Sequence, residues 1–499
     1  MISSASRSPM RSAVERLSRS FDECRSASTP HFAYCPTTMQ SDHVNQGEVA
    51  GVDRSRLERM RRREDATFRQ RTAASERLGR RARLVMPSGV PMAWMAGLYR
   101  HDPMFVVAGE GCHFVDADGH TYLDMNQADL SASCGFSPQP VVDAIVAQAK
   151  RGLQFLLPVE AAIDVAELLA ARYGLSHWQF TLSASTANVE ALRLARLATA
   201  RTKVLMFAGH YHGHWDEALV DGTERETHAE LLGLTPSAAA ETVIAPFNDL
   251  ETVARLLANH DVAAVLTEPA LTNVGVVQPD PDFHQGLREL CTRQGTLLII
   301  DETHTQMAAW GGLTRAWSLQ PDLLTLGKSV GGGVPLGAYG MTPQLAEFMD
   351  RHRDDDAGEA GLATGGTTYA NPLSLVAARA ALGEVMTVDA YSHTQRLGGK
   401  LADGIDAAAK RHRLSWRAHR LGGRSGYCLE AELPRTAEDA ARSLDVELID
   451  TRRVYLANRG IWEAIASAGP AVSFAHDDGD VATYLETLDQ FLGELTAGP

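Results

Sequence analysis

Short apolar runs alternate with amphipathic stretches through the middle of this chain. The runs are continuous rather than alternating, as in strands that are buried on both faces of a parallel sheet. Between them, stretches such as 187–198 and 283–294 repeat apolar residues at helical spacing. This order predicts an α/β fold with a mostly parallel, doubly wound sheet. The predicted strands lie at 179–182, 204–207, 263–266, 297–300 and 323–326.

The pattern changes toward both ends of the chain. Residues 1–50 are polar and rich in serine, which predicts disorder, with an organelle transit peptide as the alternative. Residues 52–84 are dominated by arginine with interspersed acids, which predicts a solvated helix. Apolar and polar residues alternate on both sides of Asp118-Gly119, which predicts a β-hairpin within 104–125. The predicted units are 1–50, disordered; 51–134, an amino-terminal helix and hairpin; 135–388, the large domain; and 389–499, a smaller α+β carboxy-terminal domain.

Charge and cysteine content narrow the class of protein. The 499 residues include 62 acidic residues and 47 lysines or arginines, for a formal net charge of −15. This acidic balance argues against nucleic acid as a partner, and the mixed charges of 52–84 favour a plain surface helix over a nucleic-acid site. The six cysteines show no CxxC spacing, which is typical of reduced thiols in a cytoplasmic enzyme. No apolar run approaches the roughly 20 residues of a membrane helix.

Two reactive side chains follow the last two predicted strands. Asp301 comes directly after the run 297–300, and Lys328 follows the run 323–326, just before the glycine cluster 331–333. Ligands of open α/β sheets bind at the carboxyl ends of the strands. A lysine amine can form a Schiff base with an aldehyde, and an acid can keep a pyridine ring protonated. The pair favours pyridoxal 5′-phosphate (PLP) chemistry; a structural acid and a surface lysine are the alternative.

Three further stretches carry candidate cofactor ligands. Ser183-Ala184-Ser185-Thr186 joins a strand to a helix, where backbone N–H groups can bind a phosphate; an ordinary Ser/Thr helix cap is the alternative. In His210-Tyr211-His212-Gly213-His214 the aromatic ring can stack on a flat cofactor, or the histidines can bind a metal. The loop 365–372 offers Thr367 as a phosphate donor, or is a connector. No Cys/His set elsewhere supports a zinc site, so no metal is predicted.

Together these segments resemble the class III, fold-type I PLP-dependent aminotransferases, near the glutamate-1-semialdehyde aminomutases and the omega-amino acid or amine transaminases. The resemblance covers about residues 83 to 390. Its most specific part runs from 298 to 340, through Asp301-Glu302, Pro321-Asp322-Leu323, Leu326-Gly327-Lys328, Gly331-Gly332-Gly333 and residues 335–340. Residues 207–216, Glu268-Pro269, Gly366-Thr367 and Asn371-Pro372 match as well.

The resemblance implies roles for individual residues. Lys328 is the expected Schiff-base lysine and Asp301 the expected partner of the pyridine nitrogen, so both are the expected catalytic residues. Tyr211 would stack on the ring. Thr367 would reach the phosphate of a neighbouring subunit, which implies a homodimer with shared active sites. The other expected cofactor-binding residues are Ser183, Ala184, Ser185, His212, Glu268, Asn273 and His304.

Several positions depart from the family pattern. The usual Ser-Gly-Thr-Glu is SAST at residues 183–186, a change that keeps the backbone donors. The usual Asp-Glu-Val-Met/Gln-Thr-Gly-Phe-Arg becomes DETHTQMA at 301–308, without the arginine. The aminomutase motif Asn-Ser-Pro-Val-Arg is replaced by GVPMAW at 89–94. A substrate carboxylate would lose an ionic partner worth about 1.5–3 kcal/mol, and Met92 and Trp94 favour a substrate with a bulky apolar part.

We expect a PLP-dependent aminotransferase that works by a ping-pong Schiff-base mechanism. Its partners would be an amine or amino acid donor and a keto acid or aldehyde acceptor, with neither nucleic acid nor a membrane involved. Lys328 would move the proton between substrate and cofactor, and Asp301 would keep the ring protonated. The alternative within the family is a glutamate-1-semialdehyde-type 2,1-aminomutase, an isomerase that keeps the amine within one molecule. The alternative outside it is a non-catalytic PLP- or metal-binding protein.

Overall fold

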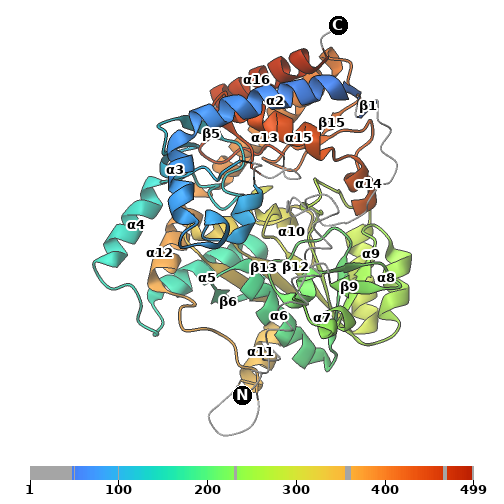
Figure 1. Cartoon of the computed structure of the whole chain (residues 1–499). Coiled ribbons are helices and arrows are strands. Elements are labelled where there is room, and N and C mark those ends of the chain that lie inside the picture. Colours follow the sequence, from blue (N-terminus) through green and yellow to red (C-terminus); the bar gives the residue numbers. More distant parts are fainter. Residues whose placement is uncertain are drawn as a thin grey trace, which may run out of the picture.

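A seven-stranded sheet forms the centre of the fold (Figure 1). The computed structural model describes residues 48–49, 51–98, 101–229, 233–353, 361–464 and 469–496. The strands of the central sheet are β6 (His177–Thr181), β7 (Lys203–Phe207), β10 (Thr242–Ala245), β11 (Val262–Thr267), β12 (Leu297–Asp301), β13 (Leu323–Leu326) and β14 (Gly337–Met341). Their order is β10-β7-β11-β12-β13-β14-β6, parallel from β10 to β13, with β14 antiparallel to both neighbours. The predicted α/β fold with a mostly parallel sheet is confirmed.

Helices cover both faces of this sheet. In β7, Val204 and Met206 pack in one core with α6 (Ala184–Thr199), whereas Leu205 and Phe207 pack in another with α8 (Leu250–Leu257) and α9 (Phe283–Gln294). Because neighbouring side chains enter opposite cores, the strands need continuous apolar runs. The other helices of this part are α4 (Gln139–Ala149), α5 (Glu160–Tyr173), α7 (Pro236–Ala240), α10 (Gly312–Ala316), α11 (Pro343–Arg351) and α12 (Pro372–Ala380).

A smaller sheet and several long helices lie above the central sheet in Figure 1. The strands are β3 (Val106–Glu110), β4 (His113–Asp116), β5 (Thr121–Asp124) and β17 (Ile461–Trp462). β4 and β5 form the predicted hairpin, and β17, from the other end of the chain, pairs parallel with β5. The helices are α13 (Val388–Arg411), α14 (Ala437–Arg442), α15 (Val446–Ala457) and α16 (Asp478–Thr496).

The two ends of the described chain share one hydrophobic core. Val52 and Leu57 pack in the same cluster as Leu397 of α13 and Leu488 and Phe491 of α16. Figure 1 shows the helix that carries Leu57 lying along the top of this lobe, beside α16. We propose from this core that most of 51–134 belongs to the same lobe as 389–499; the domain boundaries themselves stay predictions.

The arginine-rich stretch 52–84 forms two helices rather than one. They are α2 (Arg54–Arg71) and α3 (Ala73–Ala82), separated at Thr72, whose hydroxyl donates to the Phe68 carbonyl at 2.9 Å. The carboxylate of Asp118 accepts from the backbone N–H groups of Ala74 at 2.5 Å and Ser75 at 3.1 Å. The predicted hairpin turn therefore caps the second helix, a tertiary contact that helix propensity does not reveal.

Short strand pairs complete the description. They are β1 (Glu48–Val49) with β2 (Val52–Asp53), β8 (Val220–Gly222) with β9 (Thr227–Ala229), and β15 (Arg417–Ala418) with β16 (Tyr427–Cys428). The disorder predicted for 1–50 otherwise falls outside the described residues. Across the described parts of the chain, no helix combines the length and the apolar character that a membrane crossing requires.

Candidate active site

Asp301 is the last residue of β12 and lies at the carboxyl edge of the sheet. Its register partner on β13 is Thr325. The side chain of Asn188, from α6, joins the two strand ends: its Nδ2 donates to Asp301 Oδ2 at 2.8 Å, and its Oδ1 accepts from the Thr325 hydroxyl at 2.6 Å. A helix packed on the sheet thus holds the predicted catalytic acid in position.

Asp301 is buried, with 2% of its surface exposed, and is held in its ionised form. Its carboxylate accepts hydrogen bonds from His212 Nδ1 and from the backbone N–H of Thr303, both at 2.9 Å. Burial raises the pKa of Asp301, but the bonds from His212, Thr303 and Asn188 outweigh it and lower the pKa below its ordinary value. An acid of this kind can keep a neighbouring pyridine nitrogen protonated.

Lys328 follows β13 in a left-handed conformation, with φ 49°. Its Nζ donates to the backbone carbonyl of Asp129 at 3.1 Å and forms an ion pair with the carboxylate of the same residue. The carbonyl of Gly327 accepts from Gln306 Nε2 at 2.8 Å, and the Tyr391 hydroxyl donates to the Gln306 carbonyl at 3.0 Å. The backbone before the lysine is therefore supported from the small lobe.

Tyr211 is half-buried beside these groups. Burial raises the pKa of Tyr211, and the negative charges of Asp129 and Asp301 raise it further. One of these acids contacts Lys328 and the other is the predicted ring partner. Tyr211, Asp301 and Lys328 thus lie at the carboxyl ends of the parallel strands β7, β12 and β13, at one edge of the sheet.

The histidines that flank Tyr211 have separate partners. His212 binds Asp301, whereas His210 Nδ1 donates to the carbonyl of Phe207 at 2.8 Å and His214 is exposed. Burial, followed by repulsion from His212, lowers the pKa of His210 to about 3. His210 is consequently a neutral core residue, and His212 is the one that serves the site.

Three glycines from other segments of the chain pack closely against the amino end of α6. Ser183 is the N-cap residue, and its hydroxyl accepts from the backbone N–H of Thr186 at 3.3 Å, so the predicted helix cap is present. A Cβ at three glycines would collide with this helix start: Gly213 at 2.1 Å from Ser185 Oγ, Gly327 at 2.7 Å from Ala184 Cβ, and Gly337 at 2.2 Å from Ser183 O. The loop that carries Lys328 can therefore lie directly against the predicted phosphate cradle.

Glu268, Thr272 and His304 form a buried hydrogen-bonded chain. The Thr272 hydroxyl donates to the Glu268 carboxylate, so its oxygen accepts from His304 Nδ1 at 2.6 Å. Three buried atoms beside this chain have no hydrogen-bond partner among the described residues: Glu268 Oε1, Asn273 Nδ2 and His304 Nε2. Buried polar atoms are normally paired, so this side of the site matches a ligand with polar substituents.

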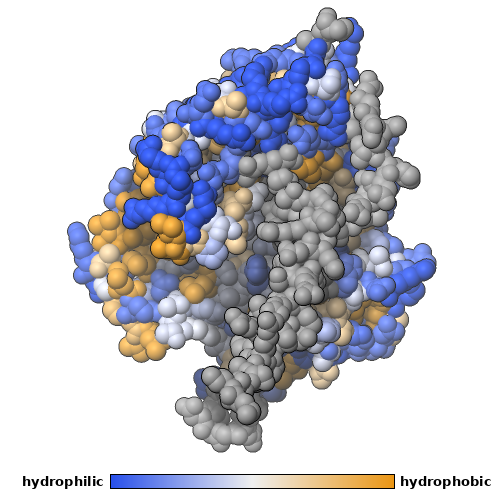
Figure 2. Space-filling model, viewed as in Figure 1, coloured by the Kyte–Doolittle hydropathy of each residue, from blue (hydrophilic) through white to orange (hydrophobic). Residues whose placement is uncertain are grey.

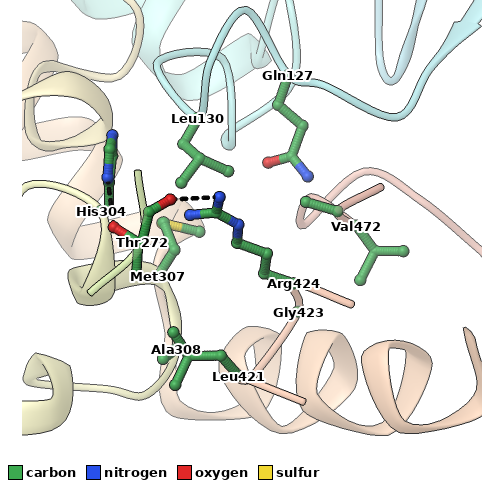
Figure 3. A pocket seen from close by; sticks show the side chains of 11 residues that line it. Gln127, Leu130, Thr272, His304, Met307, Ala308, Leu421, Gly423, Arg424 and Val472 are labelled. Atoms are coloured by element: carbon green, nitrogen blue, oxygen red, sulfur yellow. Dashed lines mark hydrogen bonds between the residues drawn. The ribbon is translucent and has the colours of Figure 1, made fainter. Parts of the chain in front are cut away.

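A pocket opens next to this chain, with Arg424 in its centre (Figure 3). One guanidinium nitrogen of Arg424 donates to the Thr272 carbonyl at 2.6 Å, and 7% of the residue is exposed. Burial lowers the pKa of Arg424, but a guanidinium keeps its charge in a protein. Gln127 and Leu130 point into the pocket from the opposite side (Figure 3). The pocket thus offers one buried cation.

Thr367 lies apart from these contacts. It is exposed, and its carbonyl accepts from Gln154 Nε2 at 2.6 Å, in the loop between α4 and α5. Within one subunit it therefore faces an exposed loop, and its predicted role depends on a second subunit.

The described residues fit the cofactor that the sequence predicts. A primary amine, an ionised buried acid and a half-buried aromatic ring lie at the carboxyl ends of parallel strands of one sheet, and a helix start lies against the loop that carries the amine. The profile of the class-III aminotransferases matches residues 95–450. The chain belongs to this family of enzymes.

Individual relatives agree with this assignment. A glutamate-1-semialdehyde 2,1-aminomutase of Chloroflexus aggregans is 33% identical over an alignment of 451 residues, which covers 85% of this chain and 100% of the relative. A glutamate-1-semialdehyde aminomutase structure from Pseudomonas aeruginosa matches with a TM-score of 0.85 at 36% identity, over 89% of this chain and 100% of that one. An omega-transaminase structure from Sphaerobacter thermophilus matches with a TM-score of 0.78 at 27% identity, over 86% of this chain and 99% of that one. The class-III resemblance and the fold-type I architecture are confirmed.

Several residues of the site were not predicted, among them Asn188, Asp129 and Arg424. Asn188 could have been found, because it is a polar residue on the buried face of the predicted helix 187–198. Asp129 lies in a turn without glycine, and Arg424 lies in a region where the sequence shows little periodicity. Only the folded structure brings Asp129 to Lys328 and Arg424 to the pocket beside His304.

Proposed function

We propose that this chain is a PLP-dependent 2,1-aminomutase, an isomerase that moves an amino group between adjacent carbon atoms of one substrate. The observation that carries this proposal is the near full-length similarity to proteins named glutamate-1-semialdehyde aminomutases, at 33% and 36% identity. The alternative that the sequence left open is thus better supported than the intermolecular aminotransferase that we expected first.

The cofactor of the family is PLP, and a variant of the Pseudomonas aeruginosa relative is known in complex with PMP, pyridoxamine 5′-phosphate, which is the amine form of PLP. Bound PLP supplies an aldehyde that couples to amines and a protonated ring that accepts electrons from the substrate carbon. Lys328 would hold it through Nζ, Asp301 would pair with the ring nitrogen and Tyr211 would stack on the ring. The backbone and hydroxyl groups of Ser183, Ala184 and Ser185 would bind the phosphate. Glu268, Asn273 and His304 would face the other polar substituents, and His212 would keep Asp301 ionised.

Lys328 and Asp301 would divide the proton chemistry between them. The freed Nζ of Lys328 takes a proton from the substrate carbon and returns it to the neighbouring position, while the Asp301 carboxylate holds its partner nitrogen in the protonated form. Asp301 is buried and Lys328 is half-buried, and partial exclusion of water strengthens their electrostatic interactions. The half-buried ring of Tyr211 shields the same space.

Arg424 would receive a carboxylate of the substrate. The stretch 89–94 lacks the arginine of the aminomutase motif, whereas Arg424 places a buried guanidinium in the pocket beside His304 (Figure 3). A charged hydrogen bond of this kind is worth about 1.5–3 kcal/mol, so one arginine can replace the other. The substrate would then be an amino compound with a carboxylate.

A transaminase is the second candidate, and one observation favours it. Met92 is 48% exposed and Trp94 is 40% exposed, in the stretch where aminomutases usually carry their arginine. A substrate with a bulky apolar group and no second charge would suit these side chains. The omega-transaminase match, at 27% identity, agrees with this candidate.

A homodimer is also part of the proposal. Leu156 and Leu157 are each 72% exposed, in the loop whose Gln154 contacts Thr367. Figure 2 shows hydrophobic surface on the flank where Figure 1 places α4 and this loop. A second subunit on this flank would cover the leucines and receive Thr367. We further propose a cytoplasmic enzyme, in keeping with the four described cysteines, which are buried and unpaired.

A half-reaction separates the two candidates. The purified enzyme, loaded with PLP, is incubated with a single amino substrate and no acceptor, and the products are identified by mass spectrometry. An aminomutase returns an isomer of the substrate, with the amine on the adjacent carbon. A transaminase releases a keto product in an amount equal to the enzyme. Release of the keto product alone would refute the aminomutase.

A further inference from the structure

The turn before Ser131 has a backbone that L-amino acids rarely adopt in succession. Four consecutive residues without glycine, from Gln127 to Leu130, have φ values of 55°, 47°, 55° and 66°. The carboxylate of Asp124 holds this turn by accepting from the backbone N–H groups of Asn126, Gln127 and Ala128 at 2.8, 3.0 and 3.3 Å. Strained backbone persists where its surroundings fix it, and it gathers at functional sites.

The turn delivers Asp129 to the amine of Lys328. The Asp129 carboxylate pairs with Nζ, and its backbone carbonyl accepts a second hydrogen bond from Nζ at 3.1 Å. Lys328 meets it from its own left-handed conformation at the end of β13. Gln127 and Leu130, close to Asp129 in the turn, point into the pocket toward Arg424 (Figure 3). The contact therefore joins the small sheet to the edge of the central sheet at the reacting group.

We propose that Asp129 is a positioning residue that holds the free amine of Lys328 as an ammonium ion, before the cofactor is loaded and whenever the amine is released in turnover. This inference rests on the proposed role of Lys328 as the cofactor-binding lysine. Loading requires the ammonium to give one proton to solvent. The nitrogen lone pair then bonds to the aldehyde carbon, whose oxygen leaves as water. The Asp129 carboxylate thereby favours the charged form of the amine, which cannot bond to the aldehyde.

Charges around the pair decide which group responds to pH. Burial raises the pKa of Asp129, but Lys328, His304 and Arg424 together lower it to about 2, so its carboxylate stays ionised at any ordinary assay pH. A change of pH within the assay range therefore does not neutralise the carboxylate of the ion pair. Without the carboxylate, the nearby cation Arg424 would favour the neutral amine. The charged and titratable groups that interact with Asp129 are Tyr211, His304 and Arg424; Asp301 in turn interacts with Tyr211, and Glu268 with Arg424.

The test uses the full-length protein without cofactor. Trinitrobenzenesulfonate, which reacts only with neutral amines, is added over a series of pH values, and labelling of the Lys328 peptide is followed by mass spectrometry. In Asp129→Asn the midpoint of labelling should move at least one pH unit lower than in the wild type. At a pH well below the midpoints of both proteins, the variant should therefore be labelled at least tenfold faster than the wild type. Asparagine tolerates the left-handed backbone, and Asp129→Ser is a second neutral variant should the first not fold. Asp129→Glu, which keeps the charge, should restore the midpoint toward that of the wild type.

A matched control comes from a second lysine–aspartate pair. Lys203 Nζ lies 2.8 Å from Asp261 at the opposite end of the strands, and Asp261→Asn should leave the Lys328 midpoint unchanged. An unchanged midpoint in the folded neutral Asp129 variants would overturn the inference, whether or not PLP binds. A shifted midpoint in a protein that never binds PLP would support the ion pair but refute the proposed function. The two claims therefore fail separately.

Discussion

His212 Nδ1 lies 2.9 Å from Asp301 Oδ2, and both side chains are buried. The histidine follows β7 and the acid ends β12, so the bond spans the intervening strand β11. Because a carboxylate only accepts, Nδ1 must carry the hydrogen, which fixes the imidazole tautomer. Asn188 donates to the same oxygen from α6. The position and the charge of Asp301 are thus set by three separate elements.

Replacing Asp301 by asparagine should lower kcat by about 100-fold or more, because the amide keeps the size but cannot hold a pyridine nitrogen protonated. The lowered pKa of Asp301 also predicts that no acid limb above about pH 4 in a kcat profile belongs to it. Steady-state kinetics over a pH series would check both statements.

The neighbouring acid is the matched control for this variant. Glu302 accepts from the Thr305 hydroxyl and from the backbone N–H of Thr314, and it is fully buried. Glu302→Gln should lower the free energy of unfolding by about 1–3 kcal/mol and change kcat per folded molecule only slightly. Equal losses of kcat in Asp301→Asn and Glu302→Gln would contradict the roles assigned to the two acids.

Gly327→Ala should weaken PLP binding by about tenfold or more. Gly327 has φ −163°, which alanine adopts freely, so the effect comes from the added Cβ, 2.7 Å from Ala184 Cβ and 2.8 Å from Ala184 N. The collision pushes the Lys328 loop away from the start of α6. In Gly399→Ala, inside α13, the new Cβ meets nothing within 4 Å, and affinity should be unchanged. Fluorescence titration with PLP measures both variants, and similar dissociation constants would argue against the packed cradle.

Arg424→Gln should raise KM for a substrate with a carboxylate by about 10- to 100-fold, because the lost bond to a charged group is worth about 1.5–3 kcal/mol. A substrate amine without a carboxylate should be affected much less. Arg420→Gln is the control, since Arg420 pairs at the surface with Asp403 and Asp406, both at 2.8 Å. Equal effects of Arg424→Gln on the two substrate types would remove Arg424 as the carboxylate partner.

Acid should destabilise the protein through His476. Burial lowers the pKa of His476 to about 4 from an ordinary 6.5, and its Nδ1 accepts from the backbone N–H of Ser473 at 2.9 Å, a bond that only the neutral ring can make. Below pH 6.5 the unfolded chain therefore binds a proton that the folded chain excludes. Stability falls as pH drops toward 4, by up to about 1.4 kcal/mol per pH unit.

The acid response can be assigned to that residue by denaturant unfolding. Between about pH 6.5 and about pH 5.5, His476→Gln should lose about 1 kcal/mol less stability than the wild type. His228, which is exposed in β9, is the control, and His228→Gln should follow the wild-type curve. If His476→Gln also follows the wild-type curve, the buried neutral histidine is not the cause of the loss of stability at acid pH.

Burial on both sides explains why so much of the central sheet could be predicted. β11 and β12 are continuous apolar runs that end at Thr267 and Asp301, and the helix α9 between them was expected. β10 and α8, which lie between β7 and β11 in the sequence, were not predicted. β14 was not predicted, because Gly337 and Gly340 have low strand propensity. Both glycines are needed for close packing, against Ser183 and Trp178 respectively, so tertiary contact decides that strand.

Reactive side chains that directly follow a predicted strand could be predicted from the sequence. Side chains that reach the site from distant segments of the chain could not. Asp301 and Lys328 each stand directly behind an apolar run. Asp129 has no comparable signal, because glycine is the usual marker of left-handed backbone and its turn has none. Arg424 reaches the pocket from the small lobe through tertiary packing alone.

The most direct test of the account is the identity of the amine that binds PLP. The protein is loaded with PLP, reduced with borohydride and digested, and the peptide that carries the added cofactor mass is sequenced. The account predicts a visible absorption band that reduction removes, with the label on Lys328 and on no other lysine, and no label in Lys328→Ala. A label on a different lysine, or a protein that shows no band and takes up no label, would contradict it.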